Sequence, residues 1–102
     1  MIELVSISGH TIPKIFCDSC GEEISNAKEA AVVFSNFMGN NQRVSASYVH
    51  KDFVKGNCMK KAEQLIRAKG EEPGWAELSS HMAYIVNNVG MTPKDIENKL
   101  AQ

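Results

Sequence analysis

Cysteine and histidine are the residues of this 102-residue chain whose spacing could support metal or redox chemistry. Cys17 and Cys20 are separated by two residues and are followed by Gly21. This spacing lets both sulfurs face one tetrahedral ion, and a glycine permits positive φ where the backbone turns back. In a reducing compartment, such a pair indicates metal binding or redox chemistry rather than a structural disulfide.

Cys58 and His50, which come later in the chain, are predicted to complete a metal site. Cys58 stands at the start of a predicted helix, where the positive end of the helix dipole favours the thiolate that a metal requires. His50 follows a predicted strand and offers a neutral imidazole nitrogen. Three thiolates and one imidazole saturate a tetrahedral ion and leave no open position for a substrate. The sequence therefore predicts one structural Zn²⁺ ion, with the ligands Cys17, Cys20, His50 and Cys58.

Other interpretations of these residues stay open at the level of the sequence. Three further residues are candidates for the fourth ligand: His10, Asp18 and Asp52. The thiols could also be buried without a metal, or Cys17 and Cys20 could form a redox pair. A redox pair is disfavoured because thioredoxin-like proteins carry the motif at a helix start within a βαβ unit. The adjacent Glu22 and Glu23 would also repel a thiolate.

The order of these residues resembles the treble-clef and zinc-ribbon families. The likeness rests on a knuckle, Cys17-x-x-Cys20-Gly21, and on a later segment, His50-Lys51…Cys58. It covers about residues 15–69 and extends especially to small bacterial proteins of unknown function that carry the same two segments. The resemblance implies a zinc-binding core built from a knuckle, a β-hairpin and a helix start. The chain departs from the treble clef in one respect, because seven residues separate His50 from Cys58 where two are common.

The apolar pattern predicts an α+β fold, with a zinc knuckle and a β-hairpin followed by two or three helices. A strand is expected at residues 2–7, after which Gly9 and Pro13 interrupt the pattern. A β-hairpin is expected over about residues 30–49, with its turn at 39–41. The strand signals thus lie on both sides of the cysteine knuckle.

Helical patterns fill the rest of the chain. Asn57 is the predicted N-cap of a first helix that runs to Lys69. A second helix is expected from Trp75, with His81 on its exposed polar side. Its apolar stripe consists of Trp75, Leu78, Met82, Ile85, Val86 and Val89. Thr92 and Pro93 are the predicted start of a short last helix that ends near Leu100.

Length and composition favour one globular domain spanning residues 1–102. We expect a zinc-binding core at 15–69 and a C-terminal helical hairpin at 70–102. Hydrophobic residues make up 43% and charged residues 23%, both ordinary for a globular protein. The start of the sequence lacks the basic-then-apolar order of a signal peptide, and no apolar run reaches the roughly 18 residues of a membrane span. A cytoplasmic location is therefore predicted.

Charge is distributed unevenly along the chain. The net charge of −1 excludes a strong global attraction to nucleic acid or anionic membrane. Residues 43–69, however, carry seven Lys and Arg residues against two Asp and Glu residues. The candidate nucleic-acid contacts in this segment are Lys55, Lys60, Lys61 and Arg67. The alternative is an ordinary solvated helix face.

Common catalytic motifs are missing from the sequence. It contains no G-x-x-x-x-G-K-[ST] phosphate loop, no G-x-G-x-x-G turn and no H-E-x-x-H helix. Together with the closed ligand set, this predicts a non-enzymatic zinc protein that acts as an adaptor or regulator. Its partner would be another protein or a second copy of itself, with no small-molecule substrate and no membrane. The alternative function is a nucleic-acid-binding zinc module that uses the basic segment 43–69.

Overall fold

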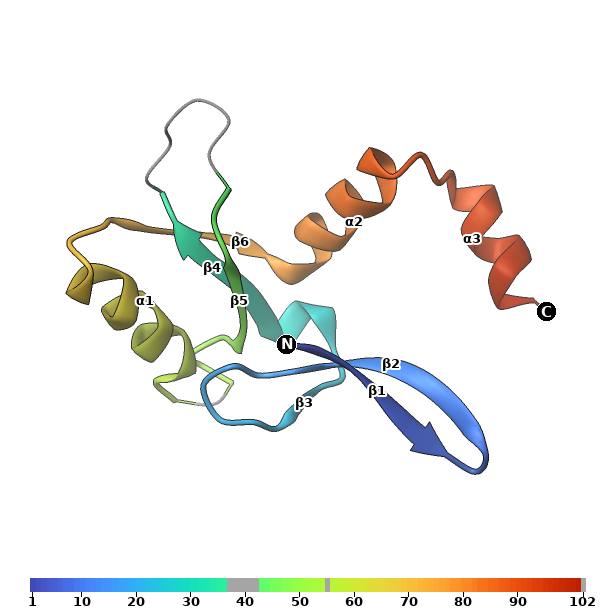
Figure 1. Cartoon of the computed structure of the whole chain (residues 1–102), viewed down its shortest axis with the longest axis horizontal. Coiled ribbons are helices and arrows are strands. Elements are labelled where there is room, and N and C mark those ends of the chain that lie inside the picture. The colour runs from blue at the N-terminus through green and yellow to red at the C-terminus, as the bar shows by residue number, and fades with distance from the viewer. Residues whose placement is uncertain (37–42, 55, 102) are drawn as a thin grey trace.

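The computed structural model describes residues 1–36, 43–54 and 56–101 and confirms the predicted α+β class (Figure 1). Two small antiparallel sheets of three strands each, in the orders β1-β2-β3 and β5-β4-β6, combine with three α-helices. The strands are β1 (Ile2–Ile7), β2 (His10–Phe16), β3 (Glu23–Ile24), β4 (Ala30–Ser35), β5 (Ala46–His50) and β6 (Pro73–Glu77). The helices are the 3₁₀ turn η1 (Ala27–Glu29), α1 (Cys58–Ala68), α2 (Leu78–Asn88) and α3 (Pro93–Leu100).

The first sheet contains a strand, β2, that the sequence pattern missed. Ser8 and Gly9 both have positive φ and form the two-residue turn that joins β1 to β2. Pro13 was expected to interrupt the strand, but it lies within β2 opposite Leu4. Met1 and Phe16 each donate a backbone hydrogen bond to the other's carbonyl. Because such hydrogen-bonded pairs alternate along an antiparallel ladder, the odd-numbered residues of β1 bond to β2. Leu4 and Pro13 therefore form a non-hydrogen-bonded pair, in which a missing N–H costs no bond to β1.

The second sheet is built around β4, whose first four residues are fully buried. Its pairing with β5 confirms the hairpin predicted over residues 30–49; the turn expected at 39–41 lies outside the described residues. Its pairing with β6 overturns the prediction that a helix begins at Trp75. Trp75 lies opposite Val33 in this sheet, because an edge strand satisfies the outer backbone groups of β4. Leu78 is instead the first residue of the helix.

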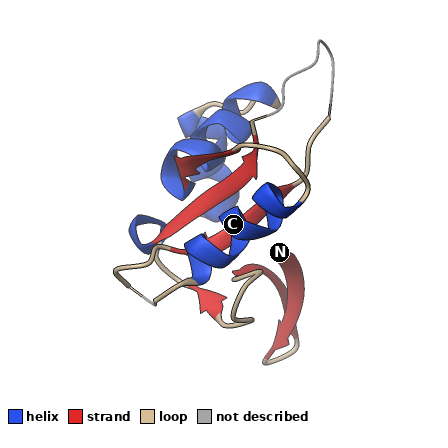
Figure 2. Ribbon diagram, turned by 90° about the vertical axis from the view of Figure 1, so that its left-hand side faces the viewer, coloured by secondary structure: helices blue, strands red, loops and turns tan. Residues whose placement is uncertain are grey.

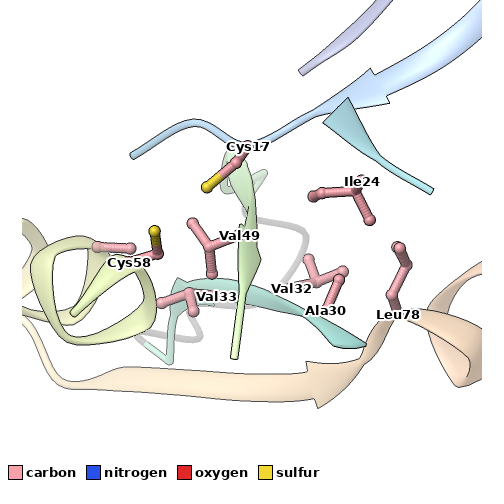
Figure 3. Close-up of a cluster of buried hydrophobic side chains, with 9 residues drawn as sticks. Cys17, Ile24, Ala30, Val32, Val33, Val49, Cys58 and Leu78 are labelled. Atoms are coloured by element: carbon pink, nitrogen blue, oxygen red, sulfur yellow. The ribbon is translucent and has the colours of Figure 1, made fainter. Parts of the chain in front are cut away.

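Helix α2 contacts β4 and β6 through its first turns (Figure 3). Leu78 is buried in the core and Met82 packs against it. His81, which was expected on an exposed face, is half-buried, and its ring lies edge-on to Tyr48 with centroids 5.7 Å apart. The prediction was wrong because it placed the helix by its own periodicity and could not include the β5 side chain opposite. Among the described residues, no helix is long and apolar enough to span a lipid bilayer.

Helix α3 extends away from both sheets (Figure 1). Thr92 and Asp95 form the predicted capping box, in which each side chain accepts a hydrogen bond from the other residue's backbone N–H. Ile96 is the one half-buried residue of this helix, and the rest are exposed. The radius of gyration is 15.2 Å, against about 13 Å for a compact chain of this length. The molecule is therefore elongated.

The start of α1 is capped differently from the prediction. Asn57 adopts a φ of +73° and its side chain accepts no capping bond from the described residues of the helix. The Asp52 carboxylate takes this role instead, because its Oδ1 accepts from the backbone N–H groups of Met59 and Lys60 at 3.1 and 3.3 Å. The acid at residue 52 thus stabilises the helix from outside its first turn, where it also complements the helix dipole.

We expect Asp52→Ala to lower the free energy of unfolding by about 1 kcal/mol, because two amide groups lose their acceptor. Asn57→Gly should change it by only about a few tenths of a kcal/mol, since glycine adopts positive φ readily. Denaturant unfolding of the metal-loaded proteins measures both values. If Asn57→Gly lowered the free energy of unfolding as much as Asp52→Ala does, Asn57 would be the residue that caps α1.

Candidate metal centre

Cys17 and Cys20, the first two residues of the predicted metal site, lie on a tight turn between β2 and β3. Cys17 follows β2 directly, and its backbone N–H donates to the Glu22 carbonyl at 2.8 Å. The Gly21 N–H donates to the Cys17 carbonyl at 2.9 Å, and Gly21 has a φ of +80°. Glycine adopts this left-handed conformation without strain, which closes the turn. Cys17 and Cys20 are therefore held by a closed backbone loop.

Hydrogen bonds from the turn to distant elements set its position. Asp18 forms two of them with Tyr48 in β5: its N–H donates to the Tyr48 carbonyl at 2.7 Å, and its Oδ2 accepts from the Tyr48 N–H at 2.8 Å. The Ser19 hydroxyl donates to the carbonyl of Cys58, the first residue of α1, at 2.7 Å. The two residues between the cysteines thus join the turn to the second sheet and to the helix.

Four side chains with metal-binding atoms converge at this point. The three sulfurs and an imidazole nitrogen of His50 all lie within 4.8 Å of one another. The Cys20 Sγ atom and the His50 Nδ1 atom are 3.5 Å apart. A tetrahedral ion with bonds of 2.0–2.3 Å places its ligands roughly 3.5–3.8 Å apart, so the group needs a contraction of about 1 Å at most. The Cys3His group therefore fits a single metal ion.

The site lies at the edge of the apolar core. Cys17, Cys58 and His50 are buried with exposures of 3, 3 and 7%, whereas Cys20 is exposed. Figure 3 shows the sulfurs of Cys17 and Cys58 pointing toward each other beside Val49. Buried thiolates require a compensating charge, because the low dielectric of the core disfavours them.

The pKa values of Cys17 and Cys58 indicate that the compensating positive charge belongs among the sulfurs. Burial acts to raise the pKa of Cys17, but hydrogen bonds from the backbone N–H groups of Cys20, His50 and Ser19 outweigh burial and lower the pKa to about 6. Burial, followed by the effect of the neighbouring Cys17 and Cys20 sulfurs, raises the pKa of Cys58 to about 12. The helix dipole expected to favour the Cys58 thiolate is therefore outweighed. A cation among the sulfurs would reverse this repulsion.

The other candidates for the fourth ligand have different places in the structure. Asp52 caps α1, as described above. Asp18 bonds to Tyr48 and its Oδ1 lies 3.1 Å from the Met1 nitrogen. His10 lies next to the turn of the β1–β2 hairpin. Within the described residues, His50 is thus the one histidine in the cluster.

The described residues that were proposed to contact nucleic acid lie on α1, the helix that begins at Cys58. Lys60, Lys61 and Arg67 are exposed on α1, and the Arg67 guanidinium lies 3.8 Å from the Glu63 carboxylate. Lys55 lies outside the described residues.

The contributions of Asp18 and Ser19 to the site were missed by sequence reasoning. No local pattern reveals them, because their partners are 30 and 39 residues away.

Comparisons of the chain with protein-family models, with curated proteins and with solved structures gave no match.

Loss of a residue that only supports a metal ligand typically weakens metal binding ~10–100-fold. His50→Ala should weaken it by more, because it removes a predicted ligand. His10→Ala and Asp52→Asn are the matched controls and should bind the metal with unchanged affinity. Competition with a chromogenic chelator measures the affinity, and the visible absorption of Co²⁺ reports the ligand set. A large loss in either control, with none in His50→Ala, would assign the fourth ligand elsewhere.

Proposed function

We propose that this protein is a non-enzymatic interaction module whose fold is held by one structural zinc ion. The observation that carries this proposal is the convergence of three thiol sulfurs and one imidazole nitrogen within 4.8 Å. Such a set saturates a tetrahedral ion, whereas catalytic zinc sites keep one position for water or substrate. The ion would bind the Cys17, Cys20 and Cys58 thiolates and His50 Nδ1.

Zinc is the favoured metal because of the ligand types. Thiolate and imidazole ligands in a tetrahedral set are typical of Zn²⁺, while Mg²⁺ and Ca²⁺ prefer oxygen. The knuckle, hairpin and helix start are also the parts that the treble-clef and zinc-ribbon resemblance implies. These features support a structural role for the metal.

Exposed apolar side chains support a role in protein interaction. Leu4, Tyr84 and Leu100 are 72, 70 and 80% exposed, and they lie on β1, α2 and α3. A further pair, Phe53 and Trp75, is 81 and 52% exposed and lines a shallow cavity with Met59. Surface aromatic residues of this kind are enriched among the residues that dominate protein interfaces. The elongated shape offers these surfaces on separate projections.

Freshly purified protein should contain one zinc ion per chain, and a chelator should unfold it. Structural zinc contributes roughly 10–16 kcal/mol of apparent binding free energy, which is comparable to the roughly 5–15 kcal/mol stability of a whole domain. Native mass spectrometry gives the stoichiometry and circular dichroism follows unfolding. A folded spectrum that persists after complete metal removal would contradict the structural role.

The interaction role is tested with the metal-loaded chain as bait in a native lysate, with the chelated chain as control. We expect a defined partner that is enriched only by the loaded chain, or a defined oligomer by light scattering. A lone monomer that captures nothing would overturn the proposed function.

Nucleic-acid binding is the second candidate function, and one observation favours it. Lys60 and Lys61 are adjacent and exposed in the first turn of α1, next to Met59 of the aromatic cavity. Surfaces that bind single strands combine positively charged side chains, which contact phosphate, with exposed aromatic rings, on which bases stack. The Arg67–Glu63 contact reduces the positive charge further along the same helix.

If this candidate is right, affinity for single-stranded DNA or RNA should fall steeply with salt. The double variant Lys60→Ala/Lys61→Ala should reduce the slope of log affinity against log salt by about 1.4, because about 0.7 is lost for each phosphate contact to a single strand. Lys94→Ala/Lys99→Ala on α3 is the matched control and should leave the slope unchanged. Undetectable binding at low salt would eliminate this function.

A further inference from the structure

The outer edge of β1 is the longest open backbone edge of the first sheet. Among the described residues β1 pairs with β2 alone, along its whole length from Ile2 to Ile7. The hydrogen-bonded pairing of Met1 with Phe16 fixes which backbone groups face outward. Hydrogen-bonded and non-hydrogen-bonded pairs alternate along an antiparallel ladder, so the odd-numbered residues bond to β2. The N–H and C=O groups of Ile2, Leu4 and Ser6 therefore point away from it.

The β1–β2 hairpin is apolar on both faces. Directly opposite residues share a face, so one face carries Ile2, Leu4, Pro13 and Ile15, and the other carries Val5, Ile7 and Ile12. Ile2 and Leu4 are 54 and 72% exposed, and Ile7 and Ile12 are 40 and 39% exposed. Figures 1 and 2 show the hairpin projecting from the rest of the molecule. A two-stranded ribbon of this kind is only marginally stable alone in water.

We propose that β1 pairs antiparallel with β1 of a second copy of this chain, about a two-fold axis that passes between the two Leu4 residues. Since the outward groups belong to even-numbered residues, only registers that place even residues opposite even residues form hydrogen-bonded pairs. The register centred on Leu4 places Ile2 opposite Ser6 of the second copy and Ser6 opposite its Ile2. It uses every outward-facing group of β1.

The neighbouring registers are less favourable. A shift toward the N-terminus places Glu3 opposite Glu3 of the second copy, and directly opposed like charges destabilise a sheet. A shift toward the turn places Ile2 opposite Ser8, which has positive φ and lies outside the strand. In the register centred on Leu4, Glu3 lies opposite Val5, and Lys14 lies across from Glu3 in its own chain. The charge pattern of the edge is therefore compatible with its own copy in this register.

Pairing in this way joins the two hairpins into one continuous sheet. Strand order would run β3-β2-β1 in one chain and β1-β2-β3 in the other, with Leu4 beside Leu4 on one face. This contact removes both exposed edges at once, since the open row of N–H and C=O groups on an edge strand is a template for pairing with another chain. It is isologous, as expected for a two-fold dimer. The inference rests on the proposed interaction function and names the partner as a second copy.

Light scattering of the zinc-loaded chain should give twice the 11.2 kDa chain mass at high concentration. Leu4→Pro should return the mass to that of the monomer, because it removes an outward N–H and leaves the bonds to β2 intact. If Leu4→Pro does not fold, Leu4→Lys tests the same contact by opposing two ammonium groups. Leu100→Lys, at a leucine that is 80% exposed on α3, is the matched control and should remain dimeric.

Amide hydrogen exchange resolved by residue gives the second readout. In the dimer, the amides of Ile2, Leu4 and Ser6 should be protected together with those of Glu3, Val5 and Ile7. In Leu4→Lys, the protection of Ile2 and Ser6 should be lost. A monomer at all concentrations, or a dimer whose even-numbered amides exchange freely, would overturn the β1 pairing. In either of those cases a captured partner, or a dimer through another surface, would leave the proposed function standing.

Discussion

The position of both sheets depends on one cluster of side chains. Cys17 and Cys20 belong to the turn of the first sheet, His50 ends β5 of the second sheet, and Cys58 begins α1. The bonds that Asp18 and Ser19 make to Tyr48 and Cys58 join the same elements, and Ile24 of β3 adds an apolar contact to the core that they share. A chain of this length has a small core, so a central link of this kind carries a large share of its stability.

The Cys17–Cys20 knuckle, the β4–β5 hairpin and α3 could be predicted from the sequence, because each follows a local rule. The knuckle at Cys17 and Cys20 follows the spacing that a tetrahedral ion requires. The β4–β5 hairpin follows strand alternation, and α3 follows the capping pattern of Thr92 and Asp95. The sequence leaves His50 as one of several candidates for the fourth position, since the residue that joins the three cysteines depends on how β5 ends beside the knuckle.

The missed features depend on partners far away in the chain. Pro13 is tolerated within β2 because it falls at a non-hydrogen-bonded position, which only the register with β1 determines. Trp75 fits a helical stripe, but in the structure it lies in β6, which pairs with β4. Gly74 in the same strand allows the Phe34 ring to approach, since a Cβ there would lie 2.9 Å from the ring. Tertiary pairing overrides local preference in each case.

The metal cluster and the open edge of β1 lie on one hairpin, and this connection has an energetic consequence. The knuckle begins where β2 ends, at Phe16 and Cys17, and Phe16 is tied by two backbone bonds to Met1 at the start of β1. A metal that fixes Cys17 would therefore hold that end of the ribbon in place. A strand already ordered loses less conformational entropy when it pairs with a partner, which raises affinity without any new contact. A structural metal can thus favour association through a strand whose side chains never contact the ion.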